Sequence, residues 1–237
     1  MNAALLTVGD ELLAGDTANT NATWLCERLA GRGVTVERVL TVPDETAVIA
    51  DATRRYSEAF DAVIVTGGLG GTPDDLTMDG VAAAFDRELV ENDLALADIE
   101  RTLEEIADDY PELNVDVSAE AEIPAGARPL INDVGLSPGC VLENVYVFPG
   151  IPSEMKGMFE GVADEFTGDV DSRFLYTEEP EANLIERLDG VRERFGVRVG
   201  CYPDREAGHN RLKISASDPE TLADAEAWLR DRVTLSE

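Results

Sequence analysis

The chain has 237 residues, with 49 acidic against 19 basic side chains and a formal net charge of −30. A surface of this charge repels nucleic acid and anionic membranes, so we expect neither as a partner. Because the Debye length falls to about 3 Å at about 1 M salt, concentrated salt makes such self-repulsion tolerable. The composition therefore predicts a cytoplasmic protein of a halophilic organism.

The cysteines and the single histidine form no metal-binding or disulfide pattern. Cys26, Cys140 and Cys201 lie far apart without CxxC spacing, which indicates small buried apolar residues. The only histidine, His209, follows Gly208 in an expected loop, so a multi-histidine metal site is excluded and Ser-His-Asp hydrolysis is not expected. No apolar run approaches the roughly 18 residues of a membrane helix, and the N-terminus has no basic region, so neither a span nor export is predicted.

Strands and helices alternate through the first part of the chain. Strands are predicted at residues 5–8, 34–42, 61–66, 140–142 and 145–148. Helices are predicted at residues 20–31, 44–60, 79–87 and 98–109 and around the apolar stripe Met155, Met158, Phe159 and Val162. Residues 110–127 are expected to be loops and short turns. This order predicts a three-layer α/β domain with a mostly parallel sheet over residues 1–168.

A second, smaller domain is expected over residues 169–237, after a weak composition break. Its predicted strands are residues 172–177, 197–200 and 212–215, and its predicted helices are residues 180–195 and 219–233. The β-α-β-β-α order indicates a small α/β sandwich.

Loops rich in glycine and acidic residues follow several predicted strands. They cover residues 9–15, 43–45, 67–75 and 149–153. In an open α/β sheet such loops converge at the carboxyl edge, where ligands bind. These loops offer backbone donors and carboxylates but few cations. We therefore expect a divalent ion, bound by carboxylate and phosphate oxygens, to hold a phosphate group at this edge.

The third of these loops carries the strongest signal. Four glycines lie within five positions after a β-branched strand, and a pair of aspartates follows: Gly67, Gly68, Gly70, Gly71, Asp74 and Asp75. Glycine lets backbone N–H groups approach an anion without a side chain in the way. The alternative is a tight strand-to-helix turn with an aspartate N-cap. The loop is neither a Walker A motif nor a Rossmann fingerprint. Asn19 and Asn21 could likewise cap a helix or contact a ligand.

These residues resemble a known family. Thr66-Gly67-Gly68-Leu69-Gly70 with Asp74-Asp75-Leu76-Thr77 resembles the signature of the molybdopterin-binding MoaB/MogA superfamily. Residues 1 to about 165 look more closely like the N-terminal part of the CinA (competence/damage-inducible) family. Supporting matches, in the family's order, are Gly9, Glu11-Leu12-Leu13, Gly15, Asn21-Ala22, Val42-Pro43-Asp44 and Pro149-Gly150-Ile151-Pro152-Ser153-Glu154-Met155.

The resemblance extends to the tail and has departures. Phe174-Leu175 and Val199-Gly200-Cys201-Tyr202-Pro203 resemble the KH-like linker domain of CinA proteins, and no trace of their C-terminal amidase domain is found, so deamidation is not expected. Gly71 stands where proline is usual, and Asn19 where aspartate is common. The resemblance also implies a homo-oligomer, expected to be a dimer.

The resemblance implies two activities. CinA-type N-terminal domains are associated with metal-dependent hydrolysis of ADP-ribose, whereas MoaB/MogA-type domains bind molybdopterin, and some adenylylate it. A non-catalytic nucleotide- or pterin-binding module is a third possibility. The cofactor is expected to be Mg²⁺ or Co²⁺, with molybdopterin as a possible ligand.

Residue roles follow from the matched motif positions. Asp44 and Asp75 match the acidic pair credited with catalysis in MogA-like enzymes. For a hydrolase, Asp74 and Asp75 are expected to hold the metal, and Asp44 or Glu45 to orient or deprotonate water. The residues expected to bind substrate are Gly9, Glu11, Gly15, Asn21, Gly67, Gly68, Gly70, Gly71, Thr72, Gly150 and Ser153.

Overall fold

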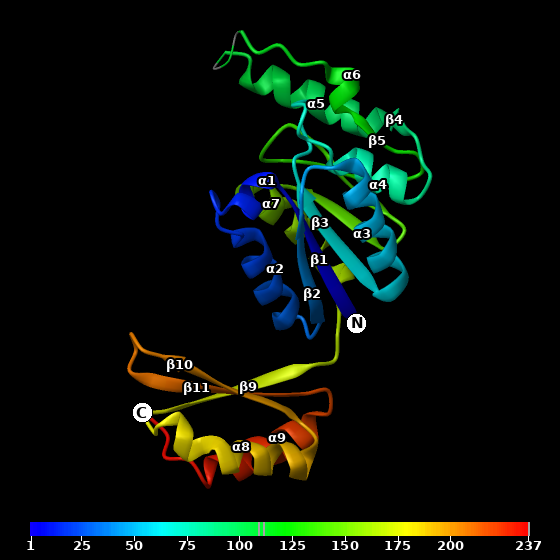
Figure 1. Ribbon diagram of the computed structural model, residues 1–237. Coiled ribbons are helices and arrows are strands. Elements are labelled where there is room, and N and C mark those ends of the chain that lie inside the picture. The colour runs from blue at the N-terminus through cyan, green and yellow to red at the C-terminus, as the bar shows by residue number, and fades with distance from the viewer. Residues whose placement is uncertain (109, 111, 237) are drawn as a thin grey trace. The chain divides into compact units, whose positions relative to one another are not determined.

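The computed structural model describes residues 1–108, 110 and 112–236. It divides into two compact units, one of residues 1–30 and 34–167 and the other of residues 31–33 and 168–237 (Figure 1). Within the described residues, no helix combines the length and apolar character needed to cross a membrane.

The first unit is built on a six-stranded sheet in the order β2-β1-β3-β8-β7-β6. Its first four strands are parallel neighbours, and β7 and β6 complete it in antiparallel pairing. The mostly parallel sheet is therefore confirmed. The strands are β1 (Asn2–Val8), β2 (Thr35–Val42), β3 (Ala62–Gly67), β6 (Arg128–Leu130), β7 (Gly139–Leu142) and β8 (Val145–Pro149).

Helices cover both faces of this sheet because its strands are apolar on both sides. Along β1, Leu5 points into one core cluster and Leu6 into the other, as the two-residue period of a strand requires. The first cluster is closed by α2 (Thr20–Gly31), α7 (Pro152–Val162) and the 3₁₀ turn Ala163–Glu165, the second by α3 (Thr46–Ala59) and α4 (Thr77–Ala84). Figure 1 shows α2 on one side of the sheet and α3 and α4 on the other. The predicted three-layer order is confirmed.

The segment between α4 and β6 is more regular than the sequence indicated. It contains β4 (Leu89–Glu91), α5 (Asp93–Ile106), α6 (Val117–Glu120) and β5 (Glu122–Pro124). Of these, α6 and β5 fall within residues 110–127, where loops and short turns were expected. Helix α5 begins before the predicted residue 98 because the Asn92 side chain accepts hydrogen bonds from the N–H groups of Leu94 and Ala95. The predicted last residue of this helix, Asp109, lies outside the described residues. A short helix, α1 (Asp10–Ala14), was also not predicted.

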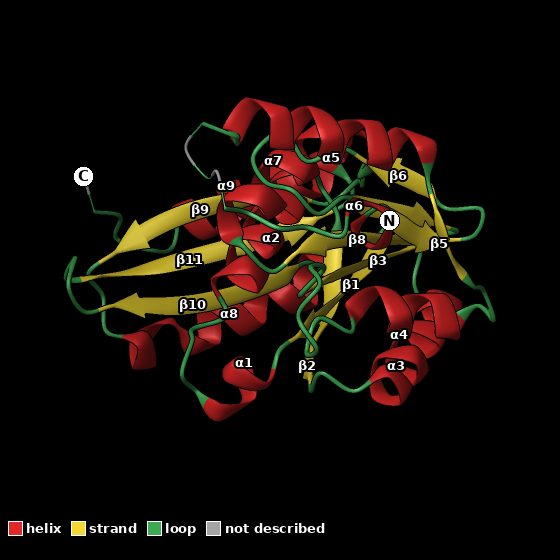
Figure 2. Cartoon of the chain, turned by 90° about the horizontal axis from the view of Figure 1, so that it is seen from above, coloured by secondary structure: helices red, strands yellow, loops and turns green. Residues whose placement is uncertain are grey.

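The second unit has the predicted β-α-β-β-α order. It contains β9 (Asp171–Thr177), α8 (Glu181–Phe195), β10 (Arg198–Asp204), β11 (His209–Ala216) and α9 (Pro219–Arg230). Figure 2 shows β11 between β9 and β10 in an antiparallel sheet. His209 begins β11 rather than lying in a loop, because residues 204–209 make a tight turn that pairs Asp204 with His209.

In the second unit, the carboxylate of Glu179 forms hydrogen bonds with both helix α8 and the C-terminal segment of the chain. Glu179 accepts hydrogen bonds from the Arg187 guanidinium at 2.6 Å and from the N–H of Thr234 at 2.6 Å. The Arg187 contact first, and the Thr234 contact next, lower the pKa of Glu179 to about 2. A carboxyl group with a depressed pKa stabilises the fold above its unfolded pKa, and the stabilisation is lost as the pH falls through the folded value.

Replacing Glu179 by Gln should lower the free energy of unfolding by about 2 kcal/mol near pH 7, because a charge-assisted network is lost. The gap between wild type and variant should shrink as the pH falls from about 4.5 towards 2, where the wild-type carboxylate becomes protonated. Urea unfolding followed by circular dichroism measures both effects. Glu186→Gln, an exposed position on α8, is the control. A gap that stays constant over this pH range would contradict the role of Glu179.

Candidate functional site

The predicted loops do meet at one edge of the sheet. Gly9, Asp44 and Gly150 follow β1, β2 and β8, which are parallel to β3 and reach the same edge. The backbone N–H of Asp10 donates to Asp44 Oδ2 at 2.8 Å, and Asn21 Nδ2 donates to the carbonyl of Gly150 at 2.7 Å. The first bond joins the loops 9–15 and 43–45, and the second joins the start of α2 to the loop 149–153.

The glycine loop is shaped around the Asp75 carboxylate. A Cβ added to Gly68 would lie 1.7 Å from Asp75 Oδ1, and a Cβ added to Gly70 would lie 3.1 Å from Asp75 Oδ2. The same Oδ2 accepts hydrogen bonds from the N–H of Thr72 at 3.2 Å and from its hydroxyl at 2.7 Å. A side chain at position 68 would therefore have to displace the Asp75 carboxylate.

A second glycine makes a close approach at the base of the loop. A Cβ added to Gly67 would lie 2.3 Å from Thr77 Oγ1 and 2.8 Å from Val8 Cβ. Thr77 is fully buried, and no described residue hydrogen-bonds its hydroxyl. Gly67 therefore lets β3 pass between β1 and the start of α4, which holds the loop at the sheet edge.

Asp74 and Asp75 converge on one hydroxyl group. Thr72 Oγ1 lies 2.7 Å from Asp74 Oδ1 and 2.7 Å from Asp75 Oδ2. The hydroxyl has one hydrogen, so it can donate to only one of the two carboxylates at a time. The hydrogen bond from Thr72 also lowers the pKa of the exposed Asp74 carboxyl. Two anionic oxygens are thereby held close together at the surface of the loop.

Two residues that the sequence did not indicate complete this loop. The Glu120 side chain accepts a hydrogen bond from the Ser137 hydroxyl at 3.2 Å, and its Oε1 lies 2.8 Å from the Cβ that Gly71 lacks. Burial raises the pKa of Glu120, and the negative charge of Asp75 raises it further, against lowering hydrogen bonds from Ser137 and the Gly71 backbone. Glu120 lies in the acidic stretch expected to be loops, so only its helical position at the end of α6 brings it here.

A small pocket of about 90 Å³ opens next to the loop, between β1, α1 and the start of α2. Three of the predicted binding residues line it, namely Glu11, Asn21 and Gly150, together with Thr66 and Asn19. Asn21 Oδ1 is buried and accepts no hydrogen bond from the described residues, although its Nδ2 is satisfied by Gly150. A buried acceptor without a donor is costly, and a ligand N–H or O–H could satisfy it.

Several residues that the sequence singled out as candidates for the site also have structural roles. Asn19 caps α2, since its Oδ1 accepts from the N–H of Ala22 at 3.1 Å. Gly15 ends α1 in the left-handed region at φ 78°, which favours glycine. Ser153 is exposed in the first turn of α7. Asp44 follows β2 and Asp75 lies in the loop after β3, so β1 lies between the strands that lead to these two residues.

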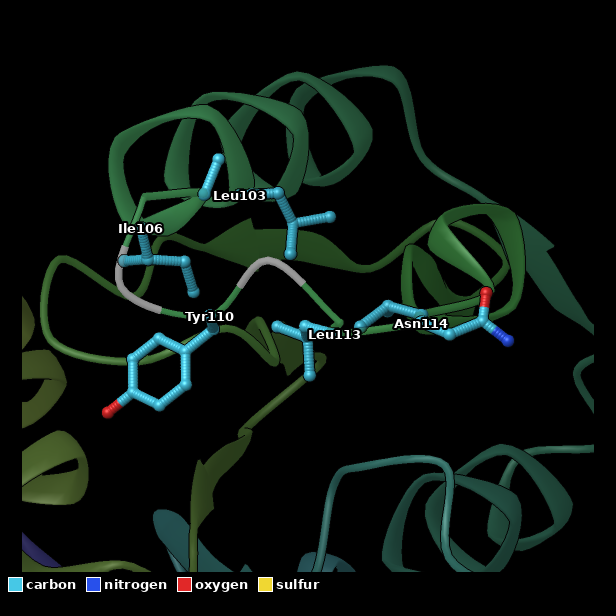
Figure 3. A pocket seen from close by; sticks show the side chains of 7 residues that line it. Leu103, Ile106, Tyr110, Leu113 and Asn114 are labelled. Atoms are coloured by element: carbon cyan, nitrogen blue, oxygen red, sulfur yellow. The ribbon is translucent and has the colours of Figure 1, made fainter.

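No cluster of three or more metal-ligating His, Cys, Asp or Glu side chains is present among the described residues. A cation at the loop would therefore have two protein carboxylates, Asp74 and Asp75, as its ligands. A separate apolar pocket lies at the end of α5, where Figure 3 shows Leu103, Ile106, Tyr110 and Leu113. None of the predicted site residues lines it.

Comparison with known proteins gives one family for each unit. The family described as "Probable molybdopterin binding domain" matches residues 4–167. The family described as "FAD synthase, middle domain" matches residues 169–236.

Individual relatives extend over most of the chain. A protein of Archaeoglobus fulgidus is 34% identical over 95% of this chain and 95% of its own length. A CinA-like protein of Citrifermentans bemidjiense is 36% identical over 99% of this chain, which spans 58% of that relative. The crystal structure of the CinA protein of Thermoplasma acidophilum, described as of unknown function, aligns with a TM-score of 0.63 at 34% identity, covering 70% of this chain and 99% of that one.

Proposed function

The chain belongs to the family of probable molybdopterin-binding domains and is a relative of the CinA-like proteins; on that premise we propose that it is a metal-dependent hydrolase of a nucleotide diphosphate such as ADP-ribose. The observation that carries this proposal is the convergence of Asp74 and Asp75 on the hydroxyl of Thr72, at 2.7 Å each. A cation between phosphate and carboxylates would relieve the repulsion of two anionic oxygens held this close.

The metal we propose is Mg²⁺ or Co²⁺, held by Asp74 and Asp75 with water and phosphate oxygens as its remaining ligands. When bound, it would neutralise charge on the diphosphate. The backbone N–H groups of residues 67–71 would lie against the same phosphates. Most of the predicted ligand contacts are backbone or amide groups. Such contacts do not depend on basic side chains, of which the chain has 19 against 49 acidic ones.

In the proposed reaction, water attacks one phosphorus of the diphosphate and the bridging P–O bond breaks. ADP-ribose then gives AMP and ribose 5-phosphate. Asp44 or Glu45 would take the proton that the attacking water loses. Asp44 is half-buried and accepts a hydrogen bond from the N–H of Asp10, which keeps its carboxylate at the sheet edge. By the same resemblance we propose that the protein works in the cytoplasm as a homodimer.

A second candidate is binding or adenylylation of molybdopterin. The family match over residues 4–167 favours it, because that family is described as molybdopterin-binding. The buried Asn21 Oδ1 could accept a hydrogen bond from a pterin ring as well as from a ribose. A binding module without catalysis would use the same edge of the sheet.

The deciding experiment uses purified protein in about 2 M KCl, because the charge of −30 calls for screening. ADP-ribose is added with Mg²⁺ or Co²⁺, and AMP is measured by chromatography. AMP that forms with metal and disappears with a chelator supports the hydrolase. Absence of AMP, with a thermal midpoint raised by molybdopterin, would transfer the assignment to the second candidate.

Replacing Gly68 by Val should weaken binding of ADP-ribose at least about tenfold, because the new side chain displaces the Asp75 carboxylate that shapes the loop. The melting temperature should change little, since Gly68 is only half-buried. Isothermal titration with ADP-ribose and Mg²⁺ measures the affinity. Gly161→Val is the matched control, because a Cβ there meets no heavy atom within 4 Å. Equal affinities for Gly68→Val and wild type would show that the loop does not hold the ligand.

A further inference from the structure

The sheet of the second unit has one buried face and one open face. Alternate residues of its strands, including Leu175, Leu212 and Ile214, are buried against α8 and α9. Figure 1 shows both helices on the same side of this sheet. The residues between them point the other way, and three of these are aromatic: Phe174 is 42% exposed, Tyr176 43% and Tyr202 49%. Large exposed aromatic residues gathered on one face indicate a binding surface.

Strand pairing arranges this open face in two rows with a cation at the centre of each. In the first row Arg211 of β11 lies between Tyr202 of β10 and Tyr176 of β9. In the second row Lys213 lies between Gly200 and Phe174. The Arg211 guanidinium is 5.7 Å from the ring centroids of both Tyr202 and Phe174, and the Lys213 ammonium is 5.9 Å from that of Phe174. Aromatic rings and cations are therefore interleaved across the strands.

Lysine and histidine are rare in this acidic chain. The sequence contains two lysines and one histidine, and Lys213 and His209 both belong to this face. Within the described part of the chain, no carboxylate forms an ion pair with Arg211 or Lys213. Arg211 interacts electrostatically with Asp204 at the neighbouring turn but is not held by it in an ion pair, so its guanidinium can still contact an anionic ligand.

A pocket lies on the open face beside the first row. A pocket of about 530 Å³ is lined by Tyr176, Tyr202, Arg205, His209 and Arg211, with acidic groups from Asp204 and Glu206 at the turn. The rings of Tyr176 and His209 meet edge to face with centroids 5.1 Å apart. Asp204 is engaged in the turn, because its carboxylate accepts from the N–H groups of Glu206 and Ala207. The pocket is therefore lined by aromatic rings, two arginines and two carboxylates.

A glycine makes room for one of these aromatic walls. A Cβ added to Gly200 would lie 2.8 to 3.0 Å from the hydroxyl and ring atoms of Tyr202. The tyrosine ring thus lies down over its own strand rather than standing away from the sheet. A ring lying along the sheet offers a flat surface on which a base can stack.

We propose that the open face of the second unit, centred on Tyr202, Arg211 and Tyr176, binds a mononucleotide, with the base against the tyrosines and the phosphate on Arg211. A pocket of 530 Å³ falls within the size range of small-molecule sites, roughly 300–1,000 Å³. A mononucleotide fits this chain better than a nucleic acid does, because a chain of net charge −30 repels a long polyanion but only weakly repels one phosphate. This site is separate from the glycine loop and does not depend on its activity.

The test is calorimetric titration of the full chain with AMP in about 1 M KCl. It is done in the Gly68→Val background so that the glycine loop does not contribute. AMP should still bind, and Arg211→Gln should weaken it about tenfold. Tyr202→Ala should weaken it to a similar degree, through the lost stacking surface. Arg192→Gln, the same charge change on an exposed position of α8, is the control and should bind AMP normally.

Three further arms decide what the face recognises. Adenosine and inorganic phosphate should each bind more weakly than AMP, since each lacks half of the ligand. An oligonucleotide of about ten deoxyadenosines that binds more tightly than AMP would overturn the mononucleotide assignment. A change of oligomeric state in Arg211→Gln with unaltered AMP binding would instead show that the face joins two copies of the chain. AMP affinity unaffected by both substitutions would also refute the proposal.

Discussion

Replacing Asp75 by Asn should reduce AMP formation from ADP-ribose by about 100-fold or more. Asn keeps an acceptor oxygen that can still receive the hydrogen bonds from Thr72 at 3.2 and 2.7 Å, so the shape of the loop should persist. The negative charge that would hold the metal is removed. The measurement is the rate of AMP release at saturating Mg²⁺, with circular dichroism to confirm folding.

Asp79→Asn is the matched control for this substitution. Asp79 is exposed in the first turn of α4, four positions after Asp75, so the same charge is removed from the same neighbourhood. Losing an acid from a first helical turn costs stability of about 0.3–1 kcal/mol but should leave turnover intact. If Asp75→Asn keeps a metal-dependent rate equal to that of Asp79→Asn, Asp75 is not a ligand of the catalytic metal.

Raising KCl from about 0.1 to 2 M should increase the melting temperature by on the order of 10 °C, equivalent to a few kcal/mol of unfolding free energy. The chain has 49 acidic and 19 basic residues, so most of its carboxylates have no cation available to them. The ion pairs that do form, such as Arg28 with Glu160 and Arg128 with Glu165, are largely exposed and contribute little each. We therefore expect salt ions to screen the excess negative charge. Thermal unfolding by circular dichroism measures the shift.

The same titration at a pH near 4.5 separates screening from other effects of salt. Many Asp and Glu side chains are protonated there, and the sequence pI is about 4.1, so the repulsion to be screened is smaller. The salt-induced rise in melting temperature should shrink accordingly. A flat response near pH 7, or an equal response at both pH values, would refute the prediction that the protein is adapted to high salt.

Parts of the candidate site could be predicted because strand ends are visible in a sequence. The β-branched run 63–65 indicates a buried strand, and the glycines that follow mark where it ends, so the sheet edge and its loops could be named. The contacts between these loops could not. The hydrogen bond from Asn21 to Gly150 joins residues 129 positions apart, and no local pattern encodes it.

The short helix α6, which lies between α5 and β5, was not predicted from the sequence. Residues 110–127 contain Pro111, Pro124 and Gly126 among many acids, which is typical of a loop. The turn of helix at α6 forms because the Asp116 side chain accepts from the N–H of Ala119, and Ala121 is buried against Ala95 and Ile99 of α5. Packing against a distant helix overrides the weak local preference, and this brings Glu120 to the glycine loop.

The sequence by itself determined the order of the main strands and helices, the doubly covered sheet and the acidic, glycine-rich edge, because these follow from hydrophobic period, turn residues and charge. Only the tertiary structure decided which contacts the side chains make. It folds Asp75 into its own loop, uses Asp44 to accept from Asp10, and adds Glu120 and Ser137. It also gathers Tyr176, Tyr202 and Arg211 from three strands onto one open face. The physical reason is that such contacts join residues far apart in the chain, whose meeting is set by strand register and core packing.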